Sequence, residues 1–252
     1  MRKAVTLLVA VCLQGLVMAA MAQDPQAVVG EIIRIKPKTG MEKQFEAAGK
    51  EHMAWHQQKQ DDWSWFVWQV MSGPGTGKYV AGTFGHKWSD FDNPKVSREE
   101  DGADAGERIG PYTASIETQY VAFLPKHSRP TDSNTPSKMA TVVTIRVKQG
   151  MEDTYLNAVS KIPKAMEKTN WPGHYGFYAL ANGGEHPTFF LVLPREKWAD
   201  FAPPDKPFEK MLEEAYGRED AEAILKTLDK APANVSSEMI VYRPDMSYVP
   251  GQ

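Results

Sequence analysis

Cysteine is nearly absent from this chain of 252 residues, since its only cysteine is Cys12. Residues 1–22 are typical of a secretory signal peptide: two basic residues precede an apolar run that ends at Ala20-Met21-Ala22, with small residues at the cleavage positions. We expect cleavage after Ala22, which places the mature chain in the periplasm or outside the cell. Cleavage also removes Cys12, so the mature chain has no disulfide, no thiolate nucleophile and no cysteine-ligated metal site.

Concentrated positive charge and further long apolar runs are also lacking. Without Arg2 and Lys3, the chain has 27 basic against 32 acidic residues and a net charge of about −5 with neutral histidines. The basic residues are scattered, which argues against a nucleic-acid partner. No second segment has the roughly 20 consecutive apolar residues that span a bilayer, so we expect no membrane association after signal cleavage.

The chain contains an internal repeat at an offset of about 110 residues. Ile33-Arg34-Ile35-Lys36 matches Ile145-Arg146-Val147-Lys148, and Lys87-Trp88-Ser89-Asp90-Phe91 matches Lys197-Trp198-Ala199-Asp200-Phe201. Between the copies lies a polar stretch with two prolines, typical of a linker. We therefore expect a signal peptide at 1–22, a first repeat at 23–126, a linker at 127–138 and a second repeat at 139–252.

Each copy has the pattern of a β-α-β-β-α-β unit. A β-branched strand is followed by a segment with apolar residues at three- and four-residue spacing, then by two strands around a glycine-containing turn. A second helical region and a last strand complete the ferredoxin-like order. The strand 65–71 is apolar at both alternating parities, so both of its faces should be covered. The sheet of the other copy is the natural cover for the second face.

A ferredoxin-like unit whose sheet packs on a second such sheet resembles the dimeric α+β barrel superfamily. That superfamily includes antibiotic-biosynthesis-type monooxygenases, EthD-like and NIPSNAP-like proteins, and haem-binding members. The resemblance implies an α+β fold in which both repeats form one barrel within a single polypeptide, as a monomer or a homo-oligomer. It also implies an oxygenase-like conversion of an aromatic or other apolar substrate without a cofactor. Because the superfamily hosts many chemistries, the site residues must decide the function.

His52 and His56 are the first candidates for such a site. With Phe45 as reference on a helix, they fall about 20° to either side of the buried face, so both should point at the sheet. The repeat places Ile162 and Met166 at the equivalent positions, where the fold needs only an apolar side chain. Imidazoles at this spacing can act as acid/base groups, bind a metal ion or ligate haem. The structural alternative is a pair of histidines that only hydrogen-bond to backbone carbonyls.

Tryptophan is concentrated in the first copy. Trp55, Trp65 and Trp68 are candidates for the walls of an apolar pocket, and aromatic core is the alternative for them. His86 follows a strand and is a third candidate ligand or acid/base group, unless it is a solvated loop side chain. We expect the acidic run of residues 99–104 to be a solvated helix face or loop.

These residues predict an exported protein that binds a small apolar or aromatic molecule in a pocket of the first repeat. If the protein is an enzyme, His52, His56 and His86 are the expected catalytic groups, with no metal and no cofactor. Two alternatives stay open. One is a haem- or metal-binding protein that uses His52 and His56 as ligands, and the other is a non-enzymatic scaffold that binds another protein.

Overall fold

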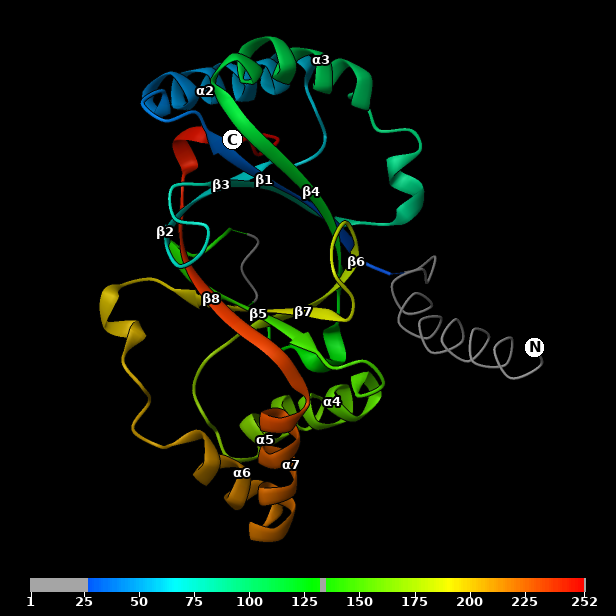
Figure 1. Ribbon diagram of the computed structural model, residues 1–252, viewed down its shortest axis with the longest axis vertical. Coiled ribbons are helices and arrows are strands. Elements are labelled where there is room, and N and C mark those ends of the chain that lie inside the picture. Colours follow the sequence, from blue (N-terminus) through cyan, green and yellow to red (C-terminus); the bar gives the residue numbers. More distant parts are fainter. Residues whose placement is uncertain (1–26, 132–134, 252) are drawn as a thin grey trace, which may run out of the picture.

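Eight antiparallel strands close into a barrel in the computed structural model, which describes residues 27–131 and 135–251 (Figure 1). The order around the barrel is β1-β3-β2-β8-β5-β7-β6-β4. The strands are β1 (Val29–Pro37), β2 (Phe66–Ser72), β3 (Tyr79–His86), β4 (Thr113–Phe123), β5 (Met139–Val147), β6 (Gly176–Asn182), β7 (Thr188–Arg195) and β8 (Pro232–Tyr242). Because β2 pairs with β8 and β4 pairs with β6, the sheet has no unpaired edge.

The helices lie outside the barrel on two opposite sides (Figure 1). One side has α2 (Glu42–Lys59) and α3 (Arg98–Arg108); the other has α4 (Glu152–Val159), α5 (Lys161–Lys168), α6 (Phe208–Tyr216) and α7 (Arg218–Lys230). Short 3-10 helices are η1 (Trp88–Phe91), η2 (Gly110–Tyr112), η3 (Pro125–His127), η4 (Trp198–Phe201) and η5 (Pro244–Met246). This is the α+β architecture that the sequence predicts.

The order of strands and helices is the same in residues 29–123 and 139–242, apart from helices that are split in the second half. The predicted signal peptide lies outside the described residues, as do residues 132–134 of the predicted linker. Among the helices that the structure describes, none combines the length and the apolar character needed to cross a membrane.

Strand β2 is covered on both faces, as its apolar pattern predicts. Trp68 packs in a cluster with Val80 of β3 and Val192 of β7, strands on different sides of the barrel, so its side chain lies in the barrel interior. Val67 has the opposite parity and packs outside the barrel with Phe45 of α2. The inner face of β2 is therefore covered by side chains from strands on the opposite side of the barrel.

The two helical sides are packed differently. On the side of α6 and α7, fully buried apolar side chains such as Met211 and Leu212 fill the space above the sheet. Helix α3 has no buried residue, and the face that it turns to the sheet includes Gly102, Ala105 and Gly106. Because these residues carry little or no side chain, space is left between α3 and the sheet.

Candidate functional site

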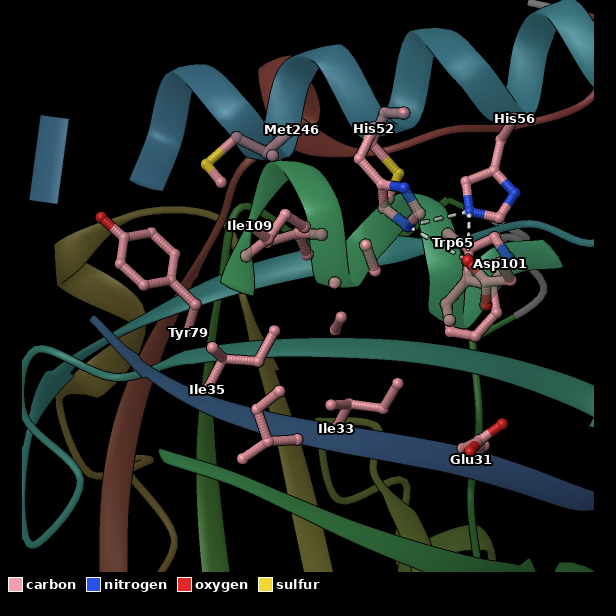
Figure 2. Close-up of a pocket in the computed structure, with 18 of the residues that line it drawn as sticks. Glu31, Ile33, Ile35, His52, His56, Trp65, Tyr79, Asp101, Ile109 and Met246 are labelled. Atoms are coloured by element: carbon pink, nitrogen blue, oxygen red, sulfur yellow. Dashed lines mark hydrogen bonds and ion pairs between the residues drawn. The ribbon is translucent and has the colours of Figure 1, made fainter. Parts of the chain in front are cut away.

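The space beneath α3 is a cavity of about 340 Å³ between α2, α3 and the outer face of β1 (Figure 2). Ile33 and Ile35 of β1 point from the sheet toward the helices, and Ile109 at the end of α3 faces them (Figure 2). The other apolar lining residues include Phe45, Val67, Ala81, Ala105 and Met246. Polar groups gather toward one end, where α2 and α3 approach each other.

Helix α2 brings His52 and His56 to this end of the cavity. They lie one turn apart on the face that also contains Phe45 and Ala48, and their exposed fractions are 6% and 1%. Figure 2 shows both rings hanging from α2 toward the space below. The expectation that both histidines face inward is confirmed.

Helix α3 supplies two carboxylates opposite these rings. Ser97 caps the helix by accepting a hydrogen bond from the Glu100 amide, and acidic residues follow in the first turn, where the helix dipole favours them. Asp101 and Asp104, three residues apart, share the side of α3 that faces α2. The expectation of a solvated acidic face is therefore wrong for these two residues.

Each imidazole donates its Nδ1–H to a separate carboxylate. His52 Nδ1 lies 2.8 Å from Asp104 Oδ1, and His56 Nδ1 lies 2.8 Å from Asp61 Oδ2. Asp61 comes just after α2 and also accepts hydrogen bonds from Trp65 Nε1 at 3.3 Å and from the Trp63 amide at 3.1 Å. Because an ionised carboxylate only accepts, Nδ1 carries the proton and Nε2 of a neutral ring has a free lone pair.

The two Nε2 atoms and one oxygen of Asp101 converge. His52 Nε2 lies 3.3 Å from His56 Nε2, and Asp101 Oδ1 lies 3.2 Å from the first and 3.3 Å from the second (Figure 2). Asp101 Oδ1 is buried, yet no N–H is directed at it with hydrogen-bond geometry. We call His52, His56, Asp61, Asp101 and Asp104 the His–Asp cluster. Its centre is a set of three acceptor atoms that needs a proton or a cation.

The charges of the cluster shift the pKa values of its members. Burial works to lower the pKa of His56, but the carboxylates of Asp101 and Asp61 outweigh it and raise that pKa to about 9. Burial works to raise the pKa of Asp101, but the neighbouring imidazoles of His52 and His56 hold it well below its usual value. The pKa of Asp61 is lowered for the same reason, by His56 against the effect of burial. The two carboxylates thus favour the protonated form of His56.

The remaining predicted site residues lie in different places. Trp65 lines the cavity. Trp55 stacks on His52, with ring centroids 5.7 Å apart, but it does not line the cavity. Trp68 is in the barrel interior, so it belongs to the aromatic core and not to this cavity. His86 is not solvated: it is buried, stacks on Trp63 and has its Nε2 2.5 Å from Thr83 Oγ1, and it does not line the cavity.

The second half of the chain has apolar residues where the first half has the cluster. Strand β5 starts at Met139, 110 residues after β1 starts at Val29. At this spacing, the residues of the cluster correspond to other types of side chain. His52 corresponds to Ile162, His56 to Met166, Asp61 to Trp171, Asp101 to Met211 and Gly102 to Leu212. Met166, Met211 and Leu212 are fully buried. The second half thus has a buried apolar cluster at these positions, and its fold does not require the His–Asp cluster.

The arrangement does not fit haem, one of the groups considered from the sequence. An axial histidine must direct a free nitrogen at the iron of a large planar ring. Here each Nε2 has the other imidazole and Asp101 within 3.3 Å, so neither faces an open slot. The three converging donor atoms could instead hold a single ion.

Comparisons with known proteins find similarity only at the level of structure. No protein-family model matches the chain, and no curated protein matches it by sequence. A solved putative monooxygenase from Lactobacillus acidophilus NCFM matches with a TM-score of 0.53 and 9% identity, over 90% of this chain and 98% of that one. The eight-stranded closed barrel and this match decide the fold. It is an eight-stranded α+β barrel, and that monooxygenase shares it.

Two further solved structures match over similar lengths. An anthrone oxidase-like protein has a TM-score of 0.51 and 13% identity, over 92% of this chain and 96% of that one. Chlorite dismutase from Candidatus Nitrospira defluvii has a TM-score of 0.51 and 10% identity, over 87% of this chain and 93% of that one. The resemblance inferred from the sequence is confirmed for the fold. Because these proteins differ in activity, the fold alone does not select a reaction.

Proposed function

We propose that the protein binds a small, mostly apolar molecule in the cavity beneath α3 and converts it in a monooxygenase-like reaction at the His–Asp cluster. One observation carries the proposal: an apolar cavity of about 340 Å³ ends at buried, convergent polar atoms of His52, His56 and Asp101. Ligand sites are mostly apolar with a few polar groups that fix orientation. An aromatic molecule of one to three rings suits both the volume and the lining.

The cluster supplies the polar chemistry. His56 is almost fully buried and donates its Nδ1–H to Asp61, while its Nε2 lies 3.3 Å from Asp101 Oδ1, so a ligand group at this end of the cavity could exchange a proton with Nε2. The oxygenase character rests on the fold, which a putative monooxygenase and an anthrone oxidase-like protein share.

We also propose that the chain acts outside the cytoplasm after signal cleavage, and that its two halves are a tandem repeat. The N-terminal sequence supports export. The recurring element order and the 110-residue spacing of matched motifs support the repeat. On this view the first half has kept or acquired the site, and the second half serves as its scaffold.

Ligand binding can be tested with a matched pair of variants on α3. Ala105 lines the cavity, whereas Ala103 on the same helix is exposed. The mature chain is titrated with anthrone, naphthalene and indole, and the fluorescence of Trp63 and Trp65 at the cavity is recorded. Binding of at least one probe by the parent is expected. Ala105→Phe should weaken it at least tenfold, about 1.4 kcal/mol, and Ala103→Phe should not. No binding by the folded parent, or equal affinities in the two variants, would contradict the proposal.

A further inference from the structure

We propose that His52 Nε2, His56 Nε2 and Asp101 Oδ1 bind one divalent transition-metal ion in the wall of the cavity. Among the described residues, these three form the one group of His, Cys, Asp and Glu side chains whose ligand atoms lie close enough together for this, all within 4.8 Å of one another. The inference rests on the geometry of the cluster and does not depend on whether the cavity binds a small molecule.

The spacing of the three atoms suits a single ion. Imidazole nitrogens and carboxylate oxygens bind Zn²⁺ and similar ions at about 2.0–2.2 Å. Two such bonds at an angle near 100° place their donor atoms about 3.2 Å apart. The observed separations are 3.2, 3.3 and 3.3 Å. An ion among the three atoms therefore needs little rearrangement of the side chains.

The outer partners of the histidines have the arrangement that metal sites use. A metal-binding histidine usually donates its other N–H to a carboxylate or a carbonyl, which fixes the tautomer and the ring orientation. Asp104 and Asp61 accept the Nδ1–H of His52 and His56, each at 2.8 Å. Asp104 is itself held by Arg108 Nε at 2.8 Å. Both rings are thus oriented with Nε2 toward the common centre.

The unsatisfied oxygen of Asp101 favours a metal over a purely structural ion pair. In a structural pair, an N–H of His52 or His56 would point at Asp101 Oδ1, but none does so with hydrogen-bond geometry although the oxygen is buried. A cation requires only that the lone pairs converge. The apolar residues that occupy these positions in the second half also argue against a requirement of the fold.

The donor set indicates the class of ion. Two imidazoles with one carboxylate suit Fe²⁺, Co²⁺ and Zn²⁺, whereas Mg²⁺ and Ca²⁺ prefer oxygen ligands. Three protein ligands leave coordination positions open, as in catalytic sites. Because His52, His56 and Asp101 all line the cavity, water or a ligand in it could reach the remaining positions.

The test is a titration of the untagged mature chain with Co²⁺ after removal of metals by a chelator. We expect one equivalent to bind with a dissociation constant below about 1 μM, to produce a visible absorption band, and to be displaced by Zn²⁺. Asp101→Asn, which keeps the shape of the side chain, should weaken binding at least a hundredfold. Glu107→Gln on the same helix and His174→Gln on the surface are matched controls that should bind as the parent does.

Two further variants keep the test decisive. Asp104→Asn should retain one equivalent but lose about 10–100-fold in affinity, as expected for an outer partner. If Asp101→Asn does not fold, the double variant His52→Ile/His56→Met, with the residues of the second half, replaces it. Absence of stoichiometric binding by the folded parent, or parental affinity in the ligand variants, overturns the metal site. Binding of aromatic probes by the metal-free chain would still support the cavity, so the two proposals fail separately.

Discussion

Replacing His56 with methionine in the metal-free protein tests how strongly the cluster is coupled to the fold. His56 is 1% exposed and donates to Asp61, which is 5% exposed. A hydrogen bond to a charged group contributes about 1.5–3 kcal/mol, and an unpaired buried charge costs about 3–5 kcal/mol. Asp61 keeps its bonds from Trp65 and Trp63, and methionine gains from burial. We expect a net loss of about 2–3 kcal/mol.

The assay is urea unfolding at pH 7 in the presence of a chelator, with the m-value compared between variants. The matched partner is Asp61→Asn, which removes the charge that His56 neutralises. If the pair is coupled, the double variant His56→Met/Asp61→Asn should be at least about 1 kcal/mol more stable than the sum of the single effects predicts. A loss below about 0.5 kcal/mol for His56→Met, or additive effects in the cycle, would refute the reasoning.

Two other predictions concern pH and helix α3. In the folded metal-free protein the pKa of His56 is raised to about 9. The contribution of protonated His56 to stability is therefore complete below the unfolded pKa of about 6.5 and is lost as the pH rises toward 9. The melting temperature should fall over this pH range, and the His56→Met variant should lack that dependence. Gly106 lies in α3, and a methyl group on its Cα would meet no atom within 4 Å. Gly106→Ala should therefore stabilise the chain by about 0.5–1 kcal/mol, measured by urea unfolding. A loss of stability would show that α3 needs the glycine.

The fold could be predicted from the sequence because the same order of local patterns occurs in both halves of the chain. Phe45 and Ala48 mark the buried face of the helix that carries His52 and His56, and helical spacing from them gives the direction of both histidine side chains. The sequence pattern does not decide which face of strand β2 turns inward, because the residues at both alternating parities are apolar. Trp68 was therefore predicted to line the same pocket as Trp65. Only closure of the barrel separates them: Trp68 lies inside, and Trp65 lies beside the cluster.

The carboxylates of the site were missed for a physical reason. Acidic residues after a serine cap are common at exposed helix starts, so Asp101 and Asp104 carry no distinctive local signal. Their role depends on how α3 packs against α2, a contact between segments that are far apart in the sequence. One signal was available: at the 110-residue spacing, His52, His56, Asp61 and Asp101 all correspond to apolar residues. Comparing the two halves position by position would have included these four residues among the candidates.

Helix α3 has no buried residue, and its side chains reach the body of the protein mainly through ion pairs, among them Arg98 with Glu31 and Asp104 with His52. Its local unfolding therefore takes little apolar surface out of the core, and the free energy of that opening depends on what the cluster holds. A cation or ligand bound between α2 and α3 would stabilise the closed helix in proportion to its affinity. The rate of amide hydrogen exchange along α3, compared with that of α2, is consequently a measure of site occupancy, even when the ligand itself gives no optical signal.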